Sequence, residues 1–370
     1  MHKNGIEPEP IVDRLARRLL RGEIRFANKR SRQFTTYHER PKFARQIGTW
    51  ADPDIPQENV AIAMQGPVMA KDDFTLETLK LYARHSPRCR LILSTWGDTP
   101  PAQLAQIASL GVEIVLNEKP TQAGLFNVNM QLVSAGNGVR RAAERGAEWI
   151  LKTRTDQRLY DPNALSFLVA LAKSFPPGRA TNQRHRIVGV GFGTLKFAPY
   201  HVTDQTVFGH ADDMLSYWTP PLRDAAPPAH WPTAQAEMFA KVPIGELCRF
   251  GAAECYIASE FLLQNGRSLT WTLEDTWAAY RDCFCFVDMA ATDFFWVKDQ
   301  SYSLHEHVNR YDIVSNRLEV GFREWMLLYS GALPPEAARR YEATLATCFN
   351  EAVVETVLPV QKRLDSIRDA

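Results

Sequence analysis

Residues 149–157 read Trp-Ile-Leu-Lys-Thr-Arg-Thr-Asp-Gln, so an apolar run turns abruptly into a charged one. The apolar part follows a glycine-containing break and predicts a short buried strand. Because alternate residues of a strand share a face, we expect Lys152, Arg154 and Asp156, with Arg158 beyond them, to lie on one side. Open α/β sheets bind ligands at the carboxyl ends of their strands. The stretch therefore predicts an anion-binding site whose lone carboxylate is available to a metal ion or a sugar hydroxyl. A solvated edge held by salt bridges is the alternative.

On both sides of this stretch, apolar runs alternate with helical patterns. Runs typical of strands occupy residues 60–64, 91–96, 112–116 and 186–190. Patterns typical of helices occupy residues 101–110, 127–145 and 163–175, and another runs from Asp73 to about Pro87. This alternation predicts an α/β fold with a Rossmann-like, mostly parallel sheet flanked by helices. The first strand lacks Gly-x-Gly-x-x-Gly and the chain lacks a P-loop motif, which argues against a dehydrogenase and a P-loop kinase.

The composition is that of an ordinary soluble protein. The chain has 370 residues, of which 45% are hydrophobic and 23% charged, and its net charge is +1. Such a charge gives no long-range attraction to nucleic acid, which we do not expect as a partner. The six cysteines show neither a paired framework nor zinc-site spacing, which indicates free thiols in a reducing compartment. We find no signal-peptide pattern and no run of 18 apolar residues, so we predict a cytoplasmic protein.

The arginine-rich N-terminal segment has the periodicity of an amphipathic helix. Ile11, Leu15 and Leu19 recur every four residues, and arginines occupy the opposite face. A basic amphipathic helix can lie on an anionic membrane surface. It can equally pack on its own domain with the arginines in water, and the sequence leaves both interpretations open. Residues 46–58 have the composition of a linker.

Polar residues also stand at or near the ends of the other predicted strands. Gln65 and Gly66 follow the first strand, Trp96 ends the second, and Asn129 lies in an Asn-x-Asn-x-Gln motif. The strand-end loops of a parallel sheet meet in one crevice. We therefore predict that all four contact a nucleotide donor, with Gln65 and the Gly66 backbone on a base or ribose. Trp96 would stack on a base or sugar, or else pack in the core.

Several motifs in this order resemble the WavE lipopolysaccharide-synthesis family. They are Met-Gln-Gly-Pro at 64–67, Phe-Thr-Leu-Glu-Thr-Leu-Lys-Leu-Tyr at 74–82, Leu-Ile-Leu-Ser-Thr-Trp at 91–96, Lys-Thr-Arg-Thr-Asp-Gln-Arg at 152–158 and Phe-Gly-x-x-x-Asp-Met at 208–214. The resemblance covers roughly residues 58–300. It implies a GT-A-like fold and a glycosyltransferase of the hexosyltransferase type, which would move a sugar from a nucleotide-diphosphate sugar to a lipopolysaccharide or capsular polysaccharide acceptor.

The sequence patterns and the resemblance together predict three regions, of which the resemblance covers only the middle one. We expect a basic helix and linker at 1–57, a GT-A-like domain at 58–310 and a helical C-terminal extension at 311–370. The nucleotide half would span about 58–160 and the acceptor half about 161–310. A proline- and tryptophan-rich loop at 218–232 is predicted to be a lid against the acceptor. A lipid-linked acceptor would place the protein peripherally on the inner face of the inner membrane.

The resemblance also bears on the metal and on the general base. GT-A-like enzymes normally hold Mn²⁺ or Mg²⁺ with an Asp-x-Asp, whereas this chain has Arg154-Thr-Asp156. Asp156 is the predicted metal ligand, or it binds sugar hydroxyls while Lys152 and Arg154 neutralise phosphate directly. Inverting transfer needs a general base, for which Asp213 is the first candidate and Glu254 the second. Plain charge at a helix N-terminus and a solvated helix face are the alternatives for these two.

Two other functions remain to be weighed. A non-catalytic sugar-nucleotide or glycan-binding scaffold is favoured by the missing first acid of Asp-x-Asp. A sugar-phosphate nucleotidyltransferase would use a similar half-sheet, but the loop after the first strand has one glycine and no cation before Lys71. The motif His305-Glu306-His307 would supply a further metal ligand or be a surface group.

Overall fold

The computed structural model describes residues 11–30, 38–48, 59–179, 181–224, 226–298 and 319–349. Its contacts divide the chain into two compact units, residues 1–42 and 43–370. The first unit contains the helix α1 (Ile11–Arg30), which has no buried residue. This confirms the predicted N-terminal helix. The domain boundaries expected at residues 57 and 310 stay predictions. Among the described helices, none combines the length and apolar character needed to cross a bilayer.

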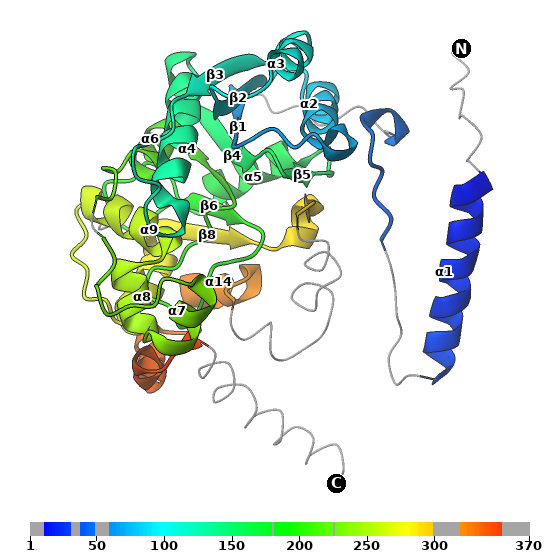
Figure 1. Ribbon diagram of the computed structural model, residues 1–370. Coiled ribbons are helices and arrows are strands. Elements are labelled where there is room, and N and C mark those ends of the chain that lie inside the picture. Colours follow the sequence, from blue (N-terminus) through cyan, green and yellow to red (C-terminus); the bar gives the residue numbers. More distant parts are fainter. Residues whose placement is uncertain are drawn as a thin grey trace. The chain divides into compact units, whose positions relative to one another are not determined.

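The second unit is built on a seven-stranded sheet with the order β3-β2-β1-β4-β7-β6-β8 (Figure 1). Its strands are β1 (Val60–Gln65), β2 (Arg90–Trp96), β3 (Glu113–Asn117), β4 (Trp149–Arg154), β6 (Ile187–Val190), β7 (Thr206–His210) and β8 (Phe284–Val287). Neighbouring strands pair in parallel except at β7, which is antiparallel to both β4 and β6. The mostly parallel sheet expected from the sequence is confirmed.

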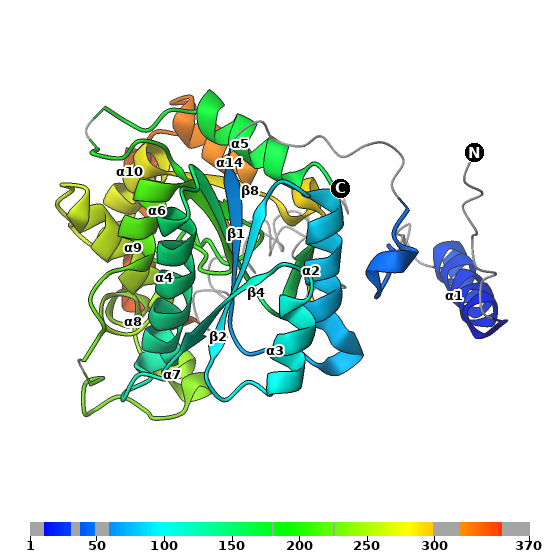
Figure 2. The same ribbon diagram turned by 90° about the horizontal axis from the view of Figure 1, so that it is seen from above.

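Helices cover both faces of this sheet, so its central strands are buried on both sides. Figure 2 shows α4 (Val128–Glu144) and α6 (Ala211–Trp218) on one face, and α2 (Phe74–His85) and α5 (Ala164–Ser174) on the other. The remaining α-helices are α3 (Pro101–Ala108), α7 (Gln235–Lys241), α8 (Ile244–Phe250), α9 (Ala253–Gln264), α10 (Leu273–Cys283) and α14 (Phe322–Tyr329). All six residues of β1 are buried, which explains the unbroken apolar run that predicted this strand.

Short elements complete the second unit. A two-stranded antiparallel sheet joins β5 (Gln157–Leu159) to β9 (Phe294–Trp296). The 3₁₀ segments are η1 (Ala44–Gln46), η2 (Lys71–Asp73), η3 (Leu125–Asn127), η4 (Met289–Thr292) and η5 (Pro335–Ala346). Both α14 and η5 pack against α10, so the described C-terminal residues form the helical layer that the sequence predicted.

One sequence-based expectation needs correction. The tryptophans of the proline-rich loop were expected in a lid, but Trp218 is the last residue of α6 and is fully buried. Trp231 packs in a small apolar cluster with Met238, Val242 and Leu247. Both rings contribute to cores because burying an indole is strongly favourable, and neither is displayed to an acceptor.

Candidate active site

The strongest concentration of charge at a strand end follows β4. Arg154 ends the strand, and its Nε and Nη2 atoms donate to Asp156 Oδ1 at 3.0 Å and Oδ2 at 3.1 Å. The Lys298 ammonium lies 2.9 Å from Asp156 Oδ2. The Asp156 side chain is only 2% exposed, whereas those of Arg154 and Lys298 are 20% and 45% exposed. One buried carboxylate thus holds two cations that still reach solvent.

The small β5–β9 sheet brings Lys298 to this position. Gln157 of β5 is in register with Trp296 of β9, and the Val297 N–H donates to the Asp156 carbonyl at 3.0 Å. Lys298 follows directly. Pairing between residues far apart in the chain therefore completes the group.

The electrostatics of Asp156 follow from these contacts. Burial alone would raise the pKa of the Asp156 carboxyl, because the charged form loses hydration. The hydrogen bonds and charge of Arg154, with a further bond from Lys298, outweigh burial and hold this pKa well below its usual range. Asp156 is therefore ionised throughout the range of physiological pH.

The end of β1 fixes the turn that carries this group. Gln65 is in register with Arg154, and its carbonyl accepts from the Thr155 N–H at 3.0 Å. Gly66 has φ +116°, and a Cβ there would lie 3.1 Å from Thr155 Oγ1, so glycine is required at this close approach. The Gln65 side chain accepts from Ser134 Oγ at 2.6 Å. The structure thus brings Gln65 and Gly66 beside Arg154, while their contact with a nucleotide stays a prediction.

Lys152 does not serve as expected. It is fully buried, its ammonium donates to the backbone carbonyls of Asp204 and Gln205, and it lies 4.2 Å from the centre of the Trp218 ring. Burial lowers the pKa of Lys152 to about 7, although the Asp204 carboxylate opposes the shift. A fully enclosed ammonium cannot touch a phosphate. The predicted donor contact of Lys152 is therefore wrong in this structure, and the side chain instead anchors the turn before β7.

A second group of titratable residues lies near Arg154. His201 Nε2 is 4.0 Å from Glu254 Oε2, and the two side chains are 15% and 27% exposed. Burial raises the pKa of Glu254, the Asp204 carboxylate raises it further, and His201 and Arg154 act in the opposite direction. Asp204 is itself 2% exposed, and its Oδ1 has no hydrogen-bond partner among the described residues. Glu254, the second-ranked base, thus lies within electrostatic reach of the β4 end.

Asp213, the first-ranked base, is placed elsewhere. Its carboxylate accepts from the backbone N–H groups of Arg184 at 3.0 Å and His185 at 2.8 Å. It follows β7, whose last residue, His210, is in register with Trp149 at the start of β4. Because β7 runs antiparallel to β4, Asp213 lies near the start of β4, at the opposite end of this strand from Arg154. The prediction that Asp213 shares the crevice is wrong, and its role is to cap a loop.

The other side chains predicted to contact the donor are buried or bonded within the protein. Trp96 is 6% exposed at the end of β2, which is consistent with core packing. The Asn129 amide donates to Gln122 and Arg223 carbonyls at 3.1 Å and 2.9 Å, and its oxygen accepts from the Arg223 N–H at 2.7 Å. Asn129 therefore ties two loops together with its whole amide. Arg158, expected on the charged face, instead bonds to Thr78 within the core.

The comparisons with known proteins fit this geometry at the family level. Residues 60–242 match the family model described as WavE lipopolysaccharide synthesis. This segment, just under half of the chain, is thus similar to the WavE family. The match spans β1, the β4 end and β7, and so includes Arg154 and Asp156. Lys298 and Glu254 lie outside it. Among curated proteins, none matches the chain.

Solved structures that align with this chain do so weakly. A 4-diphosphocytidyl-2C-methyl-D-erythritol synthase has 17% identity and a TM-score of 0.28, covering 45% of this chain and 80% of that chain. HddC from Yersinia pseudotuberculosis has 12% identity and a TM-score of 0.28, covering 44% and 80%. A mannose-1-phosphate geranyltransferase from Thermus thermophilus has 16% identity and a TM-score of 0.25, covering 44% and 53%. Scores of this size support no conclusion about activity.

The donor set at the β4 end does not suit the divalent cation expected at Asp156. Both Asp156 oxygens already accept from cationic donors, and a metal ion would have to displace Arg154 or Lys298. Within the described ranges, no cluster of three or more His, Cys, Asp or Glu side chains is suited to a metal ion. His305 and His307 lie outside the described residues. Asp156 is thus a partner of cations here, and we derive no step through a metal.

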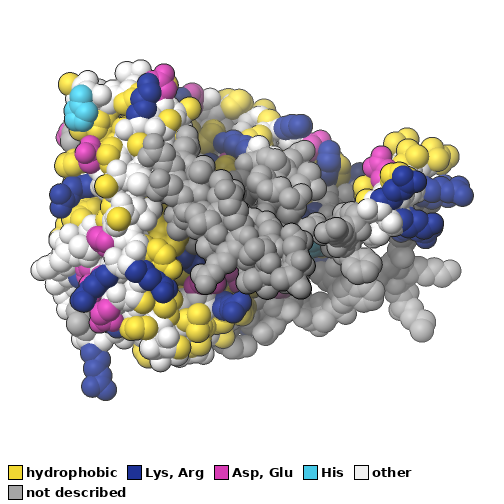
Figure 3. All heavy atoms as spheres, turned by 90° about the horizontal axis from the view of Figure 1, so that it is seen from below, with side chains coloured by type: hydrophobic (Ala, Val, Ile, Leu, Met, Phe, Trp, Pro, Cys, Tyr) yellow, Lys and Arg dark blue, Asp and Glu magenta, His cyan; other side chains and the backbone are white. Residues whose placement is uncertain are grey.

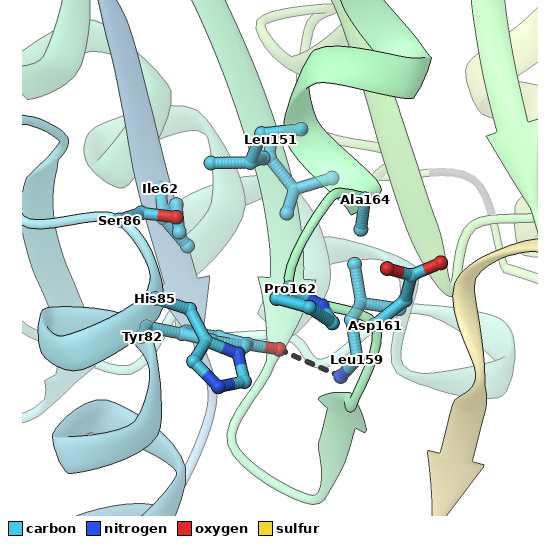
Figure 4. Close-up of a pocket in the computed structure, with 10 residues that line it drawn as sticks. Ile62, Tyr82, His85, Ser86, Leu151, Leu159, Asp161, Pro162 and Ala164 are labelled. Carbon is cyan, nitrogen blue, oxygen red and sulfur yellow. Dashed lines mark hydrogen bonds between the residues drawn. The ribbon is translucent and has the colours of Figure 1, made fainter. Parts of the chain in front are cut away.

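A small cavity lies on the other face of the sheet. It measures about 20 Å³ and is lined by Tyr82, His85, Leu151 and Leu159 among others (Figure 4). The Leu159 N–H donates to the Tyr82 hydroxyl at 3.0 Å, and His85 Nε2 has no hydrogen-bond partner among the described residues. This volume holds about one water molecule. Because Leu151 and Lys152 point to opposite faces of β4, the cavity is separate from the charged centre.

The residues predicted from the sequence include neither Lys298 nor His201. His201 carried a signal, because it begins a His-x-x-Asp motif just before a strand. Lys298 carried none, since its position depends on the pairing of β5 with β9.

Proposed function

We propose that this protein is a glycosyltransferase, which moves a sugar from a nucleotide-diphosphate sugar to a lipopolysaccharide or capsular polysaccharide acceptor. The single observation that carries the proposal is that cationic side chains and a carboxylate come together near the end of β4. Two solvent-reaching cations, Arg154 and Lys298, suit a diphosphate leaving group, and Glu254, near Arg154, suits the acceptor hydroxyl. The match of residues 60–242 to a lipopolysaccharide-synthesis family supports the same substrates.

The chemistry assigned to these residues is an inverting displacement. The Glu254 carboxylate takes the proton of the acceptor hydroxyl as that oxygen forms a bond to the anomeric carbon. The bond from this carbon to the diphosphate breaks, and its electron pair goes to the leaving phosphate oxygen. Arg154 and Lys298 stabilise the charge that develops there. A raised pKa makes Glu254 a stronger base than an ordinary carboxylate.

His201 is suited to orient this base. Its Nδ1 lies 2.8 Å from the Gly193 carbonyl oxygen, which can only accept a hydrogen bond. Nδ1 therefore carries a proton, and Nε2 faces Glu254. When the imidazole is protonated, Nε2 also carries a proton and attracts the Glu254 carboxylate, 4.0 Å away.

The location of the reaction follows from the proposed acceptor. Lipopolysaccharide intermediates are lipid-linked, so the protein would act peripherally at the inner face of the inner membrane. The helix α1 supports this, because its apolar and basic side chains occupy different faces (Figure 3). A lipid-linked glycan and an anionic membrane surface are accordingly the proposed partners.

The test replaces the proposed base. We expect Glu254→Gln to lower sugar transfer about 10²–10⁴-fold, as loss of a general base does, and to leave donor affinity nearly unchanged. Transfer from UDP-, GDP- and dTDP-linked sugars to a bacterial lipopolysaccharide core would be followed by mass spectrometry, and donor affinity by calorimetry. Glu260→Gln, further along α9, is the matched control and should retain activity.

Each other result has a defined meaning. A fully active Glu254→Gln variant would remove Glu254 from the mechanism. Donor binding without any turnover in the natural protein would favour the non-catalytic scaffold. Synthesis of a sugar nucleotide from a sugar phosphate would favour the nucleotidyltransferase.

A further inference from the structure

The charged group after β4 is complete without a metal ion. Asp156 accepts two hydrogen bonds from Arg154 and one from Lys298, and its side chain is 2% exposed. A carboxylate that ligates a divalent cation needs an oxygen facing that cation, and here the nearest charges to both oxygens are positive. Bringing a metal ion to Asp156 would place it against two cations that repel it.

The same two cations still have hydrogen-bond donors that an anion could bind. Arg154 uses only Nε and Nη2 on Asp156, and its Nη1 has no hydrogen-bond partner among the described residues. Lys298 is 45% exposed and has one carboxylate partner. Two cations around one carboxylate leave a net charge of +1 (2 − 1) on the group. Two hydrogen bonds to one carboxylate hold the guanidinium in a fixed orientation. A fixed guanidinium suits the recognition of planar or tetrahedral oxyanions.

We infer that Arg154 and Lys298 form a phosphate clamp that needs no divalent cation, with Asp156 as its positioning residue. As far as the donor is concerned, this rests on the proposed function, because the natural ligand would be the diphosphate of the sugar nucleotide. The arginine provides the directional bonds and the lysine a second charge. Asp156 touches neither phosphate nor sugar, and acts by fixing the guanidinium plane.

Binding of inorganic pyrophosphate to the full chain tests the clamp independently of catalysis. Calorimetric titrations would be run in EDTA and in MnCl₂. We expect binding in EDTA to be as tight as in Mn²⁺. Arg154→Gln should weaken it at least tenfold, and Lys298→Gln, a change at a half-exposed side chain that leaves folding intact, severalfold. Lys119→Gln is the matched control, because Lys119 is also an exposed lysine paired with a carboxylate, Asp98, near the same strand ends.

A double-mutant cycle tests the role of Asp156. Asp156→Asn should weaken pyrophosphate binding in the natural background and have little further effect in an Arg154→Gln background. A merely structural role would give additive losses. Binding abolished by EDTA and restored by Mn²⁺ would overturn the clamp, and so would unchanged affinity in both the Arg154 and Lys298 variants. Metal-free pyrophosphate binding without sugar transfer would retain the clamp and reject the proposed function.

Discussion

At the scale of single residues, the most unusual group is the fully buried Lys152. Its ammonium is satisfied by two backbone carbonyls and the face of Trp218, yet burial still lowers its pKa to about 7. An ordinary lysine in the unfolded chain titrates near 10.4. The two states therefore bind different numbers of protons between these values, and the stability of the protein must depend on pH there.

The sign follows from which state holds the proton. Between about pH 7 and about pH 10, the unfolded chain binds more protons at Lys152, so the free energy of unfolding rises with pH. Below about pH 7, both states are protonated and the dependence ends. We predict that Lys152→Met has a smaller rise in stability from pH 7 to 9.5 than the natural protein. Urea unfolding at both values measures it.

The control for this prediction is Lys241→Met, which changes a lysine that is 63% exposed. Its pH dependence should match that of the natural protein. Equal slopes for the Lys152 and Lys241 variants would show that Lys152 keeps an ordinary pKa in the fold.

The residue scale also shows why part of the site was predictable. Alternation along a strand placed Lys152, Arg154 and Asp156 together, and the structure confirms that Arg154 and Asp156 are paired. Alternation predicts on which face of the strand a side chain lies, but it does not predict how deeply that side chain is buried. Lys152 lies two positions nearer the core than Arg154, and this displacement separates a buried anchor from a solvent-reaching cation.

At the scale of elements, the contact between α4 and α6 depends on a glycine. A Cβ added at Gly136 would lie 2.7 Å from the Trp218 carbonyl oxygen, a backbone atom that cannot move aside easily. Alanine favours a helix over glycine by about 1 kcal/mol. Overpacking a close contact costs about 1–3 kcal/mol. We expect the clash to outweigh the gain in helix propensity, because the obstructing atom is a backbone atom at the end of α6.

We therefore predict that Gly136→Ala lowers the free energy of unfolding, measured by urea denaturation. Arg140→Ala on the exposed side of α4 is the control, and it should change stability by no more than about 0.5 kcal/mol. A Gly136→Ala variant more stable than the natural protein would mean that α4 and α6 separate at little cost.

The elements also mark the limit of sequence reasoning. The predicted strands at 60–64, 91–96 and 112–116 agree with β1, β2 and β3 within a residue at each end. For β1 and β2, the reason is that buried parallel strands give continuous apolar runs. The direction of a strand is not encoded in such a run. β7 is antiparallel to β4, and this direction places Asp213 at the opposite end of β4 from Arg154. Glu254, from α9, lies within electrostatic reach of Arg154, a long-range arrangement that no local pattern specifies.

At the scale of the whole molecule, the open question is what covers the apolar face of α1. Ile11, Leu15, Leu19 and Phe26 are between 56% and 72% exposed, and together with Val12 they form one face. The other face carries Arg14, Arg17, Arg18, Arg21 and Arg25. Exposing this much apolar surface to water is unfavourable, and its basic surroundings fit an anionic lipid surface, where the apolar face would enter the acyl boundary.

We predict that the full chain binds vesicles containing phosphatidylglycerol and binds pure phosphatidylcholine vesicles far less, measured by co-sedimentation. Each arginine near an anionic surface contributes about 1 kcal/mol, so Arg17→Gln should weaken binding roughly fivefold. A double Leu15→Gln, Leu19→Gln variant should lose most binding with its charge unchanged. Leu116→Gln is the matched control, because this leucine is 54% exposed outside α1. Equal binding of the natural protein and the double variant would mean that the apolar face of α1 does not bind the membrane. The alternative, that this face packs on the protein itself, would then be favoured.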